Sequence, residues 1–263
     1  MKIITSKNSQ IFKFLVRISK KSNIRKKTDN FLVEGKKEVD LCIKSNYVIK
    51  SLFATEKKIL NQSYNDIICD DRFVVSKDLM ETITYRSSSK IVAIVKRKKF
   101  DITKIKLSDD ELILVLDKPE KPGNIGAILR TYNALGFKNI IISDSKTEIY
   151  NPNIIRSSLG AIFYLNIFQL DTKKTITFLK ENNFNIYGSL IQSNNLINDI
   201  DFRKKCAVLM GTESSQINDI FLKNSNSTFR IPMIGDVDSL NLSVSTAIIL
   251  YEAMIQKKSI NFM

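Results

Sequence analysis

The chain has 263 residues, 43% of them hydrophobic, which is enough for one large domain or two smaller ones. Lysine and arginine number 41 against 27 acidic residues, so the net charge of +14 favours a polyanionic partner, nucleic acid first, over a merely lysine-rich solubilising surface. Because the chain contains no histidine, Ser-His-Asp and Cys-His mechanisms are excluded and the commonest metal ligand is missing.

The cysteines and the first residues are typical of a protein in the reducing cytoplasm. Cys42, Cys69 and Cys206 are scattered and form no CxxC pair, which predicts neither a disulfide framework nor a zinc site. The start "MKIITSKNSQIFKF" lacks a long apolar signal region, and no stretch approaches the roughly eighteen apolar residues of a membrane span. We therefore expect a cytoplasmic protein without a bound metal.

The elements predicted before residue 100 are short and alternate between strand and helix. An amphipathic helix from residue 13, a basic turn and a strand at 30–35 come first, and a helix at 36–45 follows. The series continues with strands at 49–55 and 72–76, a helix at 76–86 with Ser76 as N-cap, and a strand within 90–100. This alternation predicts a compact α/β module.

A second α/β series follows a polar, charged linker at 102–110. Its first strand, 111–117, is a continuous apolar run, which is typical of a parallel sheet buried on both faces. The remaining predicted elements are strands at 139–143, 185–191, 205–211 and 227–233, and helices at 125–137, 151–163, 175–183 and 239–258. We therefore expect a smaller α/β domain at 1–105 and a parallel-sheet domain at 106–263.

Three of the eight glycines and two of the four prolines gather in "DKPEKPGNIGAILRTYNALGF", from residue 117 to 137. Gly123 and Gly126 would let a strand-to-helix loop pass close to a ligand, with Asn124 between them and Arg130 on the following helix. The spacing matches neither the GxGxxG fingerprint nor the GxxxxGK[ST] phosphate loop. For this stretch alone, a tight turn followed by a solvated arginine remains an open alternative.

Two further stretches follow buried strands at the same predicted edge of the sheet, where α/β proteins bind ligands. "LMGTESSQI" places Gly211 and Glu213 directly after a strand, and "IPMIGDVDSLNLSVSTAIILYE" places Ser239 and Asn241 at a helix start. Each stretch also has an ordinary interpretation, as a charge at a helix N-terminus or as helix capping. One cap requires a single side chain, however, and the stretch from 231 to 252 supplies four candidates: Ser239, Asn241, Ser243 and Ser245.

In this order, the three stretches resemble the three motifs of the SpoU (TrmH-type) branch of the SPOUT RNA methyltransferases. The matching patterns are N-x-G-x-x-x-R, G-x-E and I-P-M-x-G…S-L-N-x-S, and "NPNIIRSSLGAIF" is similar to the family's intervening segment. The beginning of the chain, with "FLVEGKKEV", is similar to the ribosomal-protein-like RNA-binding domain that many members carry. Together these resemblances cover nearly the whole chain.

The resemblance implies an RNA 2′-O-ribose methyltransferase that uses S-adenosylmethionine. The implied fold is an α/β parallel-sheet SPOUT domain with a C-terminal trefoil knot, preceded by a smaller α/β RNA-binding domain. The family also forms homodimers through its catalytic domains. A knot would not be expected from the residues themselves, since threaded chains are rare.

The motifs carry the family's functional residues over to this chain. The expected cofactor-binding residues are Gly211, Ile231, Leu240, Leu190 and Met233. The expected catalytic and substrate-facing residues are Arg130, Asn124, Glu213, Ser239 and Asn241. Since the pKa of arginine is above about 12, we expect Arg130 to anchor a phosphate and stabilise the developing alkoxide rather than act as a base.

One motif departs from the family pattern. Where the family has G-x-E-G-x-G-L, this chain has Ser214 and Gln216 in place of two glycines. If those glycines adopt positive φ, each replacement costs roughly 1 to 2 kcal/mol or diverts the loop.

The leading hypothesis is therefore methylation of 23S rRNA. One alternative is 2′-O-methylation of tRNA. The other is a ribosome-associated RNA-binding protein without catalytic activity, which the replacement of two family glycines by Ser214 and Gln216 suggests. The sequence does not specify the methylated nucleotide.

Overall fold

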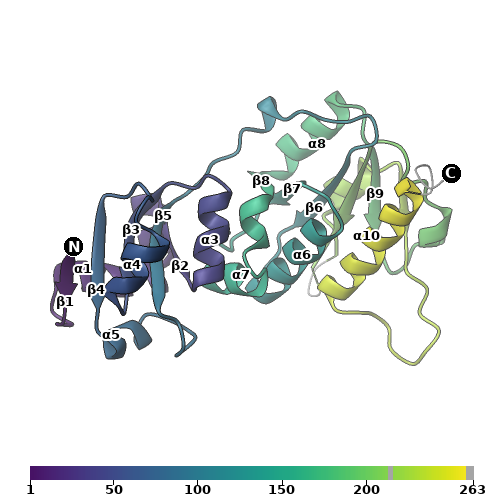
Figure 1. Cartoon of the computed structure of the whole chain (residues 1–263). Coiled ribbons are helices and arrows are strands. Elements are labelled where there is room, and N and C mark those ends of the chain that lie inside the picture. Colours follow the sequence, from purple (N-terminus) through teal and green to yellow (C-terminus); the bar gives the residue numbers. More distant parts are fainter. Residues whose placement is uncertain (213–215, 259–263) are drawn as a thin grey trace. The chain divides into compact units, whose positions relative to one another are not determined.

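The computed structural model describes residues 1–212 and 216–258, and the chain divides into two compact units (Figure 1). The first unit comprises 1–98 together with 148–163, and the second comprises 99–147 and the chain from 164 onward. The chain therefore passes from one unit to the other three times. The assignment of domains to 1–105 and 106–263 stays a prediction.

The first unit is built on a five-stranded mixed sheet with the strand order β1-β4-β3-β5-β2. Parallel pairs join β1 (Lys2–Ile4) to β4 (Asp71–Val75) and β4 to β3 (Ile49–Ala54). β5 (Ile91–Lys96) runs antiparallel to both β3 and β2 (Asn30–Glu34). β2 is therefore an edge strand whose outer side needs a cover.

Five helices accompany this sheet: α1 (Gln10–Lys20), α2 (Ser22–Thr28), α3 (Lys36–Lys44), α4 (Lys57–Ser63) and α5 (Lys77–Glu81). In α1 the apolar residues Phe12, Leu15 and Ile18 recur every three positions and are buried, which gives the helix one core-facing stripe. They pack in one cluster with side chains of α5 and of the sheet.

Residues 148–163 join the first unit through α7 (Pro152–Ser157), which packs against β2, and a 3-10 turn (Ala161–Tyr164). The Nε of Arg25 donates to Oε2 of Glu148 at 2.6 Å, and both side chains are almost fully buried. The ring of Tyr150 stacks on Phe31 with centroids 4.3 Å apart. A buried ion pair and an aromatic stack thus tie this segment to strands and helices more than a hundred residues earlier.

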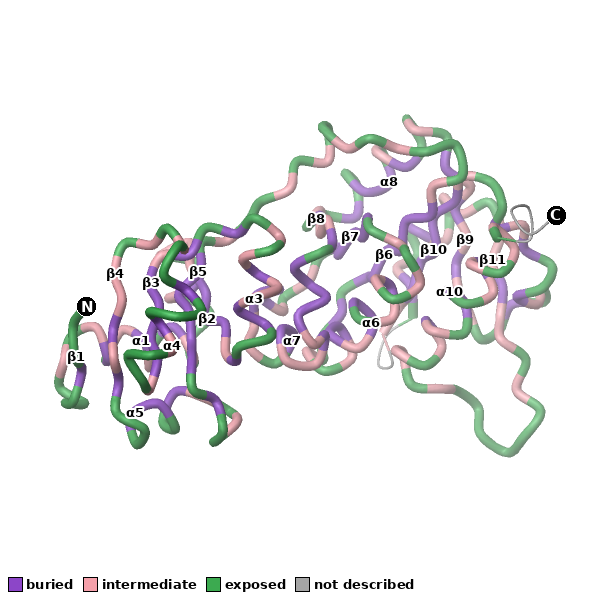
Figure 2. The backbone as a smooth tube through the Cα atoms, viewed as in Figure 1, coloured by how far each residue is buried: buried purple, intermediate pink, exposed green. Residues whose placement is uncertain are grey.

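The second unit contains a six-stranded sheet with the order β11-β9-β10-β6-β7-β8, and all its pairs are parallel. The strands are β6 (Leu112–Asp117), β7 (Asn139–Ser143), β8 (Asn166–Leu170), β9 (Asn185–Ser189), β10 (Cys206–Met210) and β11 (Ser227–Phe229). β6, β7 and β10 are buried at every position, as a central parallel strand covered on both faces must be (Figure 2).

Helices cover both faces of this sheet. On one face, Leu179 of α8 (Thr172–Glu181) and Phe221 of α9 (Asp219–Lys223) share a buried cluster with alternate residues of β6 and β10. The other face carries α6 (Pro122–Ala134) and α10 (Leu242–Lys258), which pack side by side (Figure 1). The hydroxyl of the fully buried Tyr132 in α6 lies 2.9 Å from the carbonyl of Leu112 and 2.5 Å from that of Asn139.

These two sheets confirm the predicted α/β class with a parallel sheet preceded by a smaller α/β unit, whereas the trefoil knot stays a prediction. Several element bounds differ from the prediction. The helix predicted at 76–86 ends at Glu81, its predicted cap Ser76 makes no capping hydrogen bond, and the predicted basic turn contains α2. The strand predicted at 227–233 ends at Phe229. β1, α4, β8 and α9 were not predicted, because each is too short to show a clear hydrophobic period.

Among the described residues, no helix is long and apolar enough to span a bilayer. Within the same residues, no group of three or more cysteine or carboxylate side chains is arranged to hold a metal ion.

Candidate cofactor and substrate site

The carboxyl edge of the parallel sheet holds a cavity of about 360 Å³. Its walls are the residues that follow β9, β10 and β11 and the start of α10, all within the second unit. Such an edge, where the strands of a parallel sheet end side by side, is where α/β proteins bind ligands. The five residues predicted to bind cofactor all line this cavity: Leu190, Gly211, Ile231, Met233 and Leu240.

The lining of this cavity suits a nucleoside-like cofactor. Leu190, Ile231 and Leu240 give it apolar walls, and Ser239 and Asp238 add a hydroxyl and a carboxylate. Its volume falls within the range of small-molecule sites, which combine apolar walls with a few polar groups. An adenine ring could lie against the apolar walls, while Asp238 would favour the positive charge of S-adenosylmethionine.

A second, smaller hollow of about 80 Å³ adjoins the first and shares Thr212 and Leu242 with it. Asn124, in the first turn of α6, lines this hollow. The Nδ2 of Asn241 donates to Oδ1 of Asn124 at 3.4 Å. Two amides from predicted motifs that are 117 residues apart in the chain therefore meet beside the larger cavity.

Asn241 also caps α10. Its Oδ1 accepts hydrogen bonds from the backbone N–H and the hydroxyl of Ser243, at 2.9 and 2.7 Å. The capping interpretation of this stretch therefore holds for Asn241, and the cap fixes the direction in which its Nδ2 points. Ser239 is exposed and lines the larger cavity without capping the helix.

Arg130 lies further along α6, six residues after Asn124, and is exposed. It lines neither hollow. Among the described residues it forms no ion pair. Six residues of helix place it about 9 Å along the axis from Asn124.

The backbone of the "PGNIG" stretch differs from the loop expected there. α6 begins at Pro122, so Gly123, Asn124 and Gly126 lie in helical backbone, and neither glycine has a positive φ. A Cβ added at Gly123 would meet no atom within 4 Å. Gly123 is therefore not required by the local packing, and the space beside it is open.

Glu213 and Ser214 fall outside the described residues, so their predicted roles are untested by the geometry. Gln216, the other departure from the family pattern, is exposed and lines the larger cavity. Its Nε2 donates to Oε1 of Gln192 at 3.2 Å. The side chain at this position thus links the segment after β10 to the segment after β9 through a hydrogen bond that a glycine could not make.

Asp117, at the end of β6, belongs to this edge but was not among the predicted site residues. Its Oδ2 accepts a hydrogen bond from the backbone N–H of Asn218 at 2.8 Å, and its Oδ1 is buried with no hydrogen-bond partner among the described residues. Burial raises the pKa of this carboxyl above its ordinary value, although the Asn218 N–H opposes the shift. The sequence signal was an acidic residue closing an otherwise apolar strand.

A parallel sheet with a ligand cavity at its carboxyl edge, flanked by converging amides, defines an α/β enzyme of the nucleotide- or cofactor-binding class. The SpoU rRNA Methylase family matches residues 111–251, which is more than half of the chain, and this protein belongs to that family. The MRM3-like substrate binding domain matches residues 8–93.

Relatives match along nearly the full length. The chain is 25% identical to the 23S rRNA (guanosine(2553)-2′-O)-methyltransferase RlmP of Bacillus subtilis over 95% of its own length and 98% of that protein. The AdoMet-bound rRNA methyltransferase from Sinorhizobium meliloti has a similar structure, with a TM-score of 0.87, 26% identity and coverage of 96% and 97% of the two chains. The SpoU methyltransferase AviRb from Streptomyces viridochromogenes, at 23% identity and a TM-score of 0.89 over 96% and 99%, shares the fold.

These comparisons confirm the predicted family, the predicted enzyme class of RNA 2′-O-methyltransferases and S-adenosylmethionine as the family's cofactor. The roles of individual site residues, the homodimer and the cytoplasmic location stay predictions.

Proposed function

We propose that this protein transfers the methyl group of S-adenosylmethionine to a ribose 2′-oxygen of 23S rRNA. The observation that carries the proposal is the cavity at the sheet edge, where all five expected cofactor residues meet beside Asn124 and Asn241. The full-length similarity to an enzyme of that specificity from Bacillus subtilis supports the choice of substrate. We place the reaction in the cytoplasm.

Bound in the larger cavity, S-adenosylmethionine would supply an electrophilic methyl group. The chain's own residues would hold the nucleophile in line with it, which is the main catalytic contribution available to a site without a histidine base. Asn124 lines the smaller hollow and is hydrogen-bonded to Asn241, and amide groups there can donate to and accept from ribose hydroxyls. Ser239, which lines the larger cavity, would hydrogen-bond to the cofactor or the sugar.

Arg130 would bind the phosphate next to the target ribose. As the 2′-hydroxyl loses its proton, negative charge grows on its oxygen, and a fixed guanidinium nearby lowers the energy of that state. The proton would leave to water or to a phosphate oxygen, because arginine does not give up its own proton. Asn124 and Arg130 are separated by roughly 9 Å along the helix axis. One nucleotide can span this separation, with its ribose at Asn124 and its neighbouring phosphate at Arg130.

The first domain, at 1–105, would grip the RNA outside the catalytic domain at 106–263. The match of residues 8–93 to a substrate-binding domain supports this role. The net charge of +14 of the whole chain suits binding to RNA phosphates. Folded rRNA offers exposed nucleotides that such a domain can recognise by shape and phosphate contacts.

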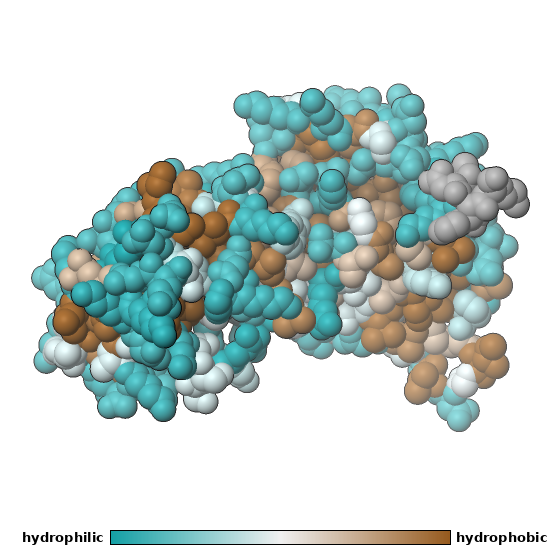
Figure 3. All heavy atoms as spheres, in the orientation of Figure 1, coloured by the Kyte–Doolittle hydropathy of each residue, from teal (hydrophilic) through white to brown (hydrophobic). Residues whose placement is uncertain are grey.

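A second copy of the chain would pack on α10. Val244, Ile248, Tyr251 and Ile255 lie on this helix with 39–57% of their surface exposed, at the spacing of one helical face. Figure 3 shows hydrophobic side chains gathered over the region of α10. An apolar stripe of this kind on a monomer usually marks an interface. Ile248→Asp should convert a dimer to a monomer in sedimentation velocity, and a wild-type monomer would refute the proposed assembly.

The proposed reaction is tested with radiolabelled S-adenosylmethionine and unmodified 23S rRNA, 16S rRNA and bulk tRNA, separated on one gel. We expect label in 23S rRNA alone. Label in tRNA alone would establish the alternative substrate. If no RNA is labelled and calorimetry detects no S-adenosylmethionine binding, the protein is an RNA-binding member of the family without catalysis.

A further inference from the structure

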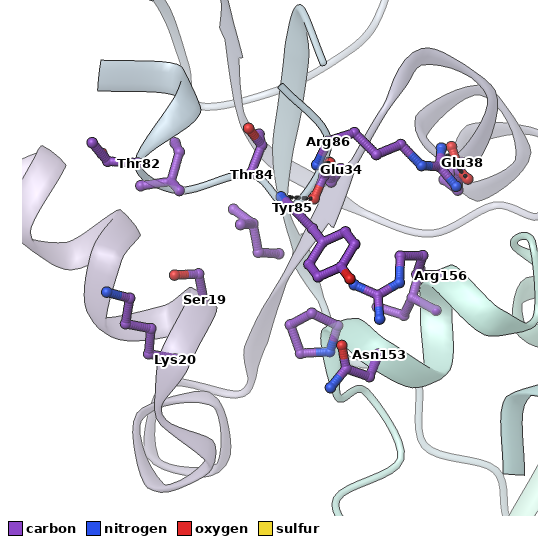
Figure 4. Close-up of a pocket in the computed structure, with 14 residues that line it drawn as sticks. Ser19, Lys20, Glu34, Glu38, Thr82, Thr84, Tyr85, Arg86, Asn153 and Arg156 are labelled. Atoms are coloured by element: carbon purple, nitrogen blue, oxygen red, sulfur yellow. Dashed lines mark hydrogen bonds and ion pairs between the residues drawn. The ribbon is translucent and has the colours of Figure 1, made fainter. Parts of the chain in front are cut away.

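The first unit contains a separate cavity of about 210 Å³ that none of the proposed cofactor or catalytic residues lines (Figure 4). Its lining comes from the end of α1 with Ser19 and Lys20, from Glu34 of β2 and Glu38 of α3, from the loop after α5 with Tyr85, and from α7 with Asn153. The α7 residues come from the 148–163 segment, so the cavity exists only because that segment folds into the first unit.

Tyr85 is the most unusual residue of this cavity, because 74% of its surface is exposed. The loop that carries it is nevertheless fixed by the carboxylate of Glu34. Oε2 of Glu34 accepts the backbone N–H of Tyr85, and Oε1 accepts the backbone N–H of Arg86 and the hydroxyl of Ser89, all at 2.8 Å. The backbone that carries this exposed ring is therefore fixed before any ligand arrives, which reduces the entropy lost on binding.

Arg156 of α7 covers one face of this ring. Its guanidinium carbon lies 3.5 Å from the centre of the Tyr85 ring. Figure 4 shows the two side chains next to each other. A guanidinium stacked on tyrosine orients the ring and makes the pair positively charged. Since most of the Tyr85 surface is still exposed, the second face of the ring is open for a further planar group.

The cavity is lined by three cationic side chains, Lys20, Arg86 and Arg156, and by the two carboxylates of Glu34 and Glu38. Lys20 is exposed at the cavity wall and forms no ion pair among the described residues, and Arg156 contributes the second cation. Arg86, by contrast, pairs with the buried Glu38 at 3.2 Å and supports the loop. Asn153 adds an exposed amide that can donate and accept hydrogen bonds at the same wall.

We propose that this cavity binds one unpaired nucleotide of the RNA substrate, with its base stacked on the open face of Tyr85 and its phosphate held by Lys20 and Arg156. Base stacking on an exposed aromatic residue beside cations is how proteins bind single-stranded nucleotides, whereas a paired base presents no face to a ring. The inference deepens the proposed function, on which it rests, by assigning a particular recognition site to the first unit.

The test measures binding of the full-length protein to an unmodified 23S rRNA transcript. Tyr85→Ala should weaken binding about tenfold and Arg156→Ala several-fold, while Tyr85→Phe should bind like the wild type because the ring remains. The matched control is Ile68→Ala, which removes a 95% exposed apolar side chain from the same unit without touching the cavity. Because Tyr85 is exposed, its replacement should leave the unfolding midpoint unchanged.

Ultraviolet crosslinking locates the contact directly. The tryptic peptide DLMETITYR contains Tyr85 as its single aromatic residue, so a nucleotide attached to this peptide identifies the stacked base by mass spectrometry. Binding of Tyr85→Ala within twofold of the wild type would overturn the inference, as would equal losses in Tyr85→Ala and Tyr85→Phe.

The failure of this site is distinguishable from a failure of the proposed function. If the wild type methylates 23S rRNA and Tyr85→Ala does so with unchanged KM, only the nucleotide site is wrong. If no RNA is methylated but Tyr85→Ala still loses affinity for the transcript, the nucleotide site stands and the proposed activity is wrong.

Discussion

The two units organise their cavities in opposite ways. In the second unit every strand is parallel, so the loops after β9, β10 and β11 meet at one edge and the candidate cofactor residues come together there. In the first unit the sheet is mixed, and its cavity lies between a helix end, a loop and a segment from much later in the chain. A parallel sheet thus supplies a site by its topology, whereas a mixed sheet needs an added segment to build one.

The strongest test of this contrast is Arg130→Ala in the second unit. If Arg130 stabilises charge at the reacting oxygen, methyl transfer should fall at least about a hundredfold, or roughly 3 kcal/mol, while S-adenosylmethionine binding stays unchanged. Arg130→Lys should recover part of the rate. Lys223→Ala, which removes an exposed cation elsewhere in this unit, serves as the control, and an active Arg130→Ala enzyme would refute the role.

The first unit is tested next through Glu148→Ala. This change leaves Arg25 buried without its carboxylate partner, which should cost about 3 kcal/mol in the free energy of unfolding. Lys104→Ala, at an exposed pair with Asp101, should cost almost nothing. Denaturant titration measures both. A double change to Arg25→Met and Glu148→Leu should be far milder than Glu148→Ala alone, and equal losses would show that packing rather than charge is responsible.

A smaller effect is expected from Leu240→Ala at the cofactor cavity. Loss of one apolar wall should weaken S-adenosylmethionine binding about tenfold, since a buried leucine side chain contributes roughly 1.5 kcal/mol. Binding of the rRNA transcript should not change, because no proposed RNA contact is removed. Calorimetry with the cofactor and a filter-binding assay with the transcript separate the two results, and unchanged cofactor affinity would remove Leu240 from the site.

The smallest expected effect is that of Asp117→Asn on the pH dependence of stability. Because burial raises the pKa of this carboxyl above 3.8, the folded state binds the proton more tightly than the unfolded state. Its contribution to stability is therefore present at low pH and is lost as pH rises from 3.8 through the folded-state pKa. Asp117→Asn should remove that decline, and a difference curve that is flat with pH would contradict the assignment.

Much of the second unit could be predicted because its signals are local. A continuous apolar strand such as 111–117 specifies a buried parallel strand, and side chains directly after such strands must lie at one edge. The meeting of Asn124 with the cap residue Asn241 follows from that rule once the motifs are recognised. This rule does not place Arg130, which is an exposed residue within a helix. The direction in which such a side chain points depends on its position around the helix, and its role depends on the surface that binds there.

The first unit's cavity could not have been predicted from local patterns. Nothing in "TITYR" distinguishes Tyr85 from an ordinary surface aromatic until Glu34 fixes its loop and Arg156 stacks behind it. Both partners are distant in the chain, and a sequence pattern carries no information on such pairs. The placement of α6 also escaped prediction, because Pro122 begins the helix where its glycines suggested a loop.

The insertion of residues 148–163 into the first unit has a consequence for dissecting this protein. Because the chain crosses between the units three times, neither unit is one continuous stretch of sequence. Neither unit can therefore be expressed as a single fragment or released intact by one proteolytic cut. A truncation that deletes the N-terminal residues leaves Tyr150, Ile154 and Phe163 without their apolar neighbours, and the remnant should be prone to aggregate. A chimera that exchanges the N-terminal domain between relatives would therefore have to exchange the sixteen residues 148–163 as well.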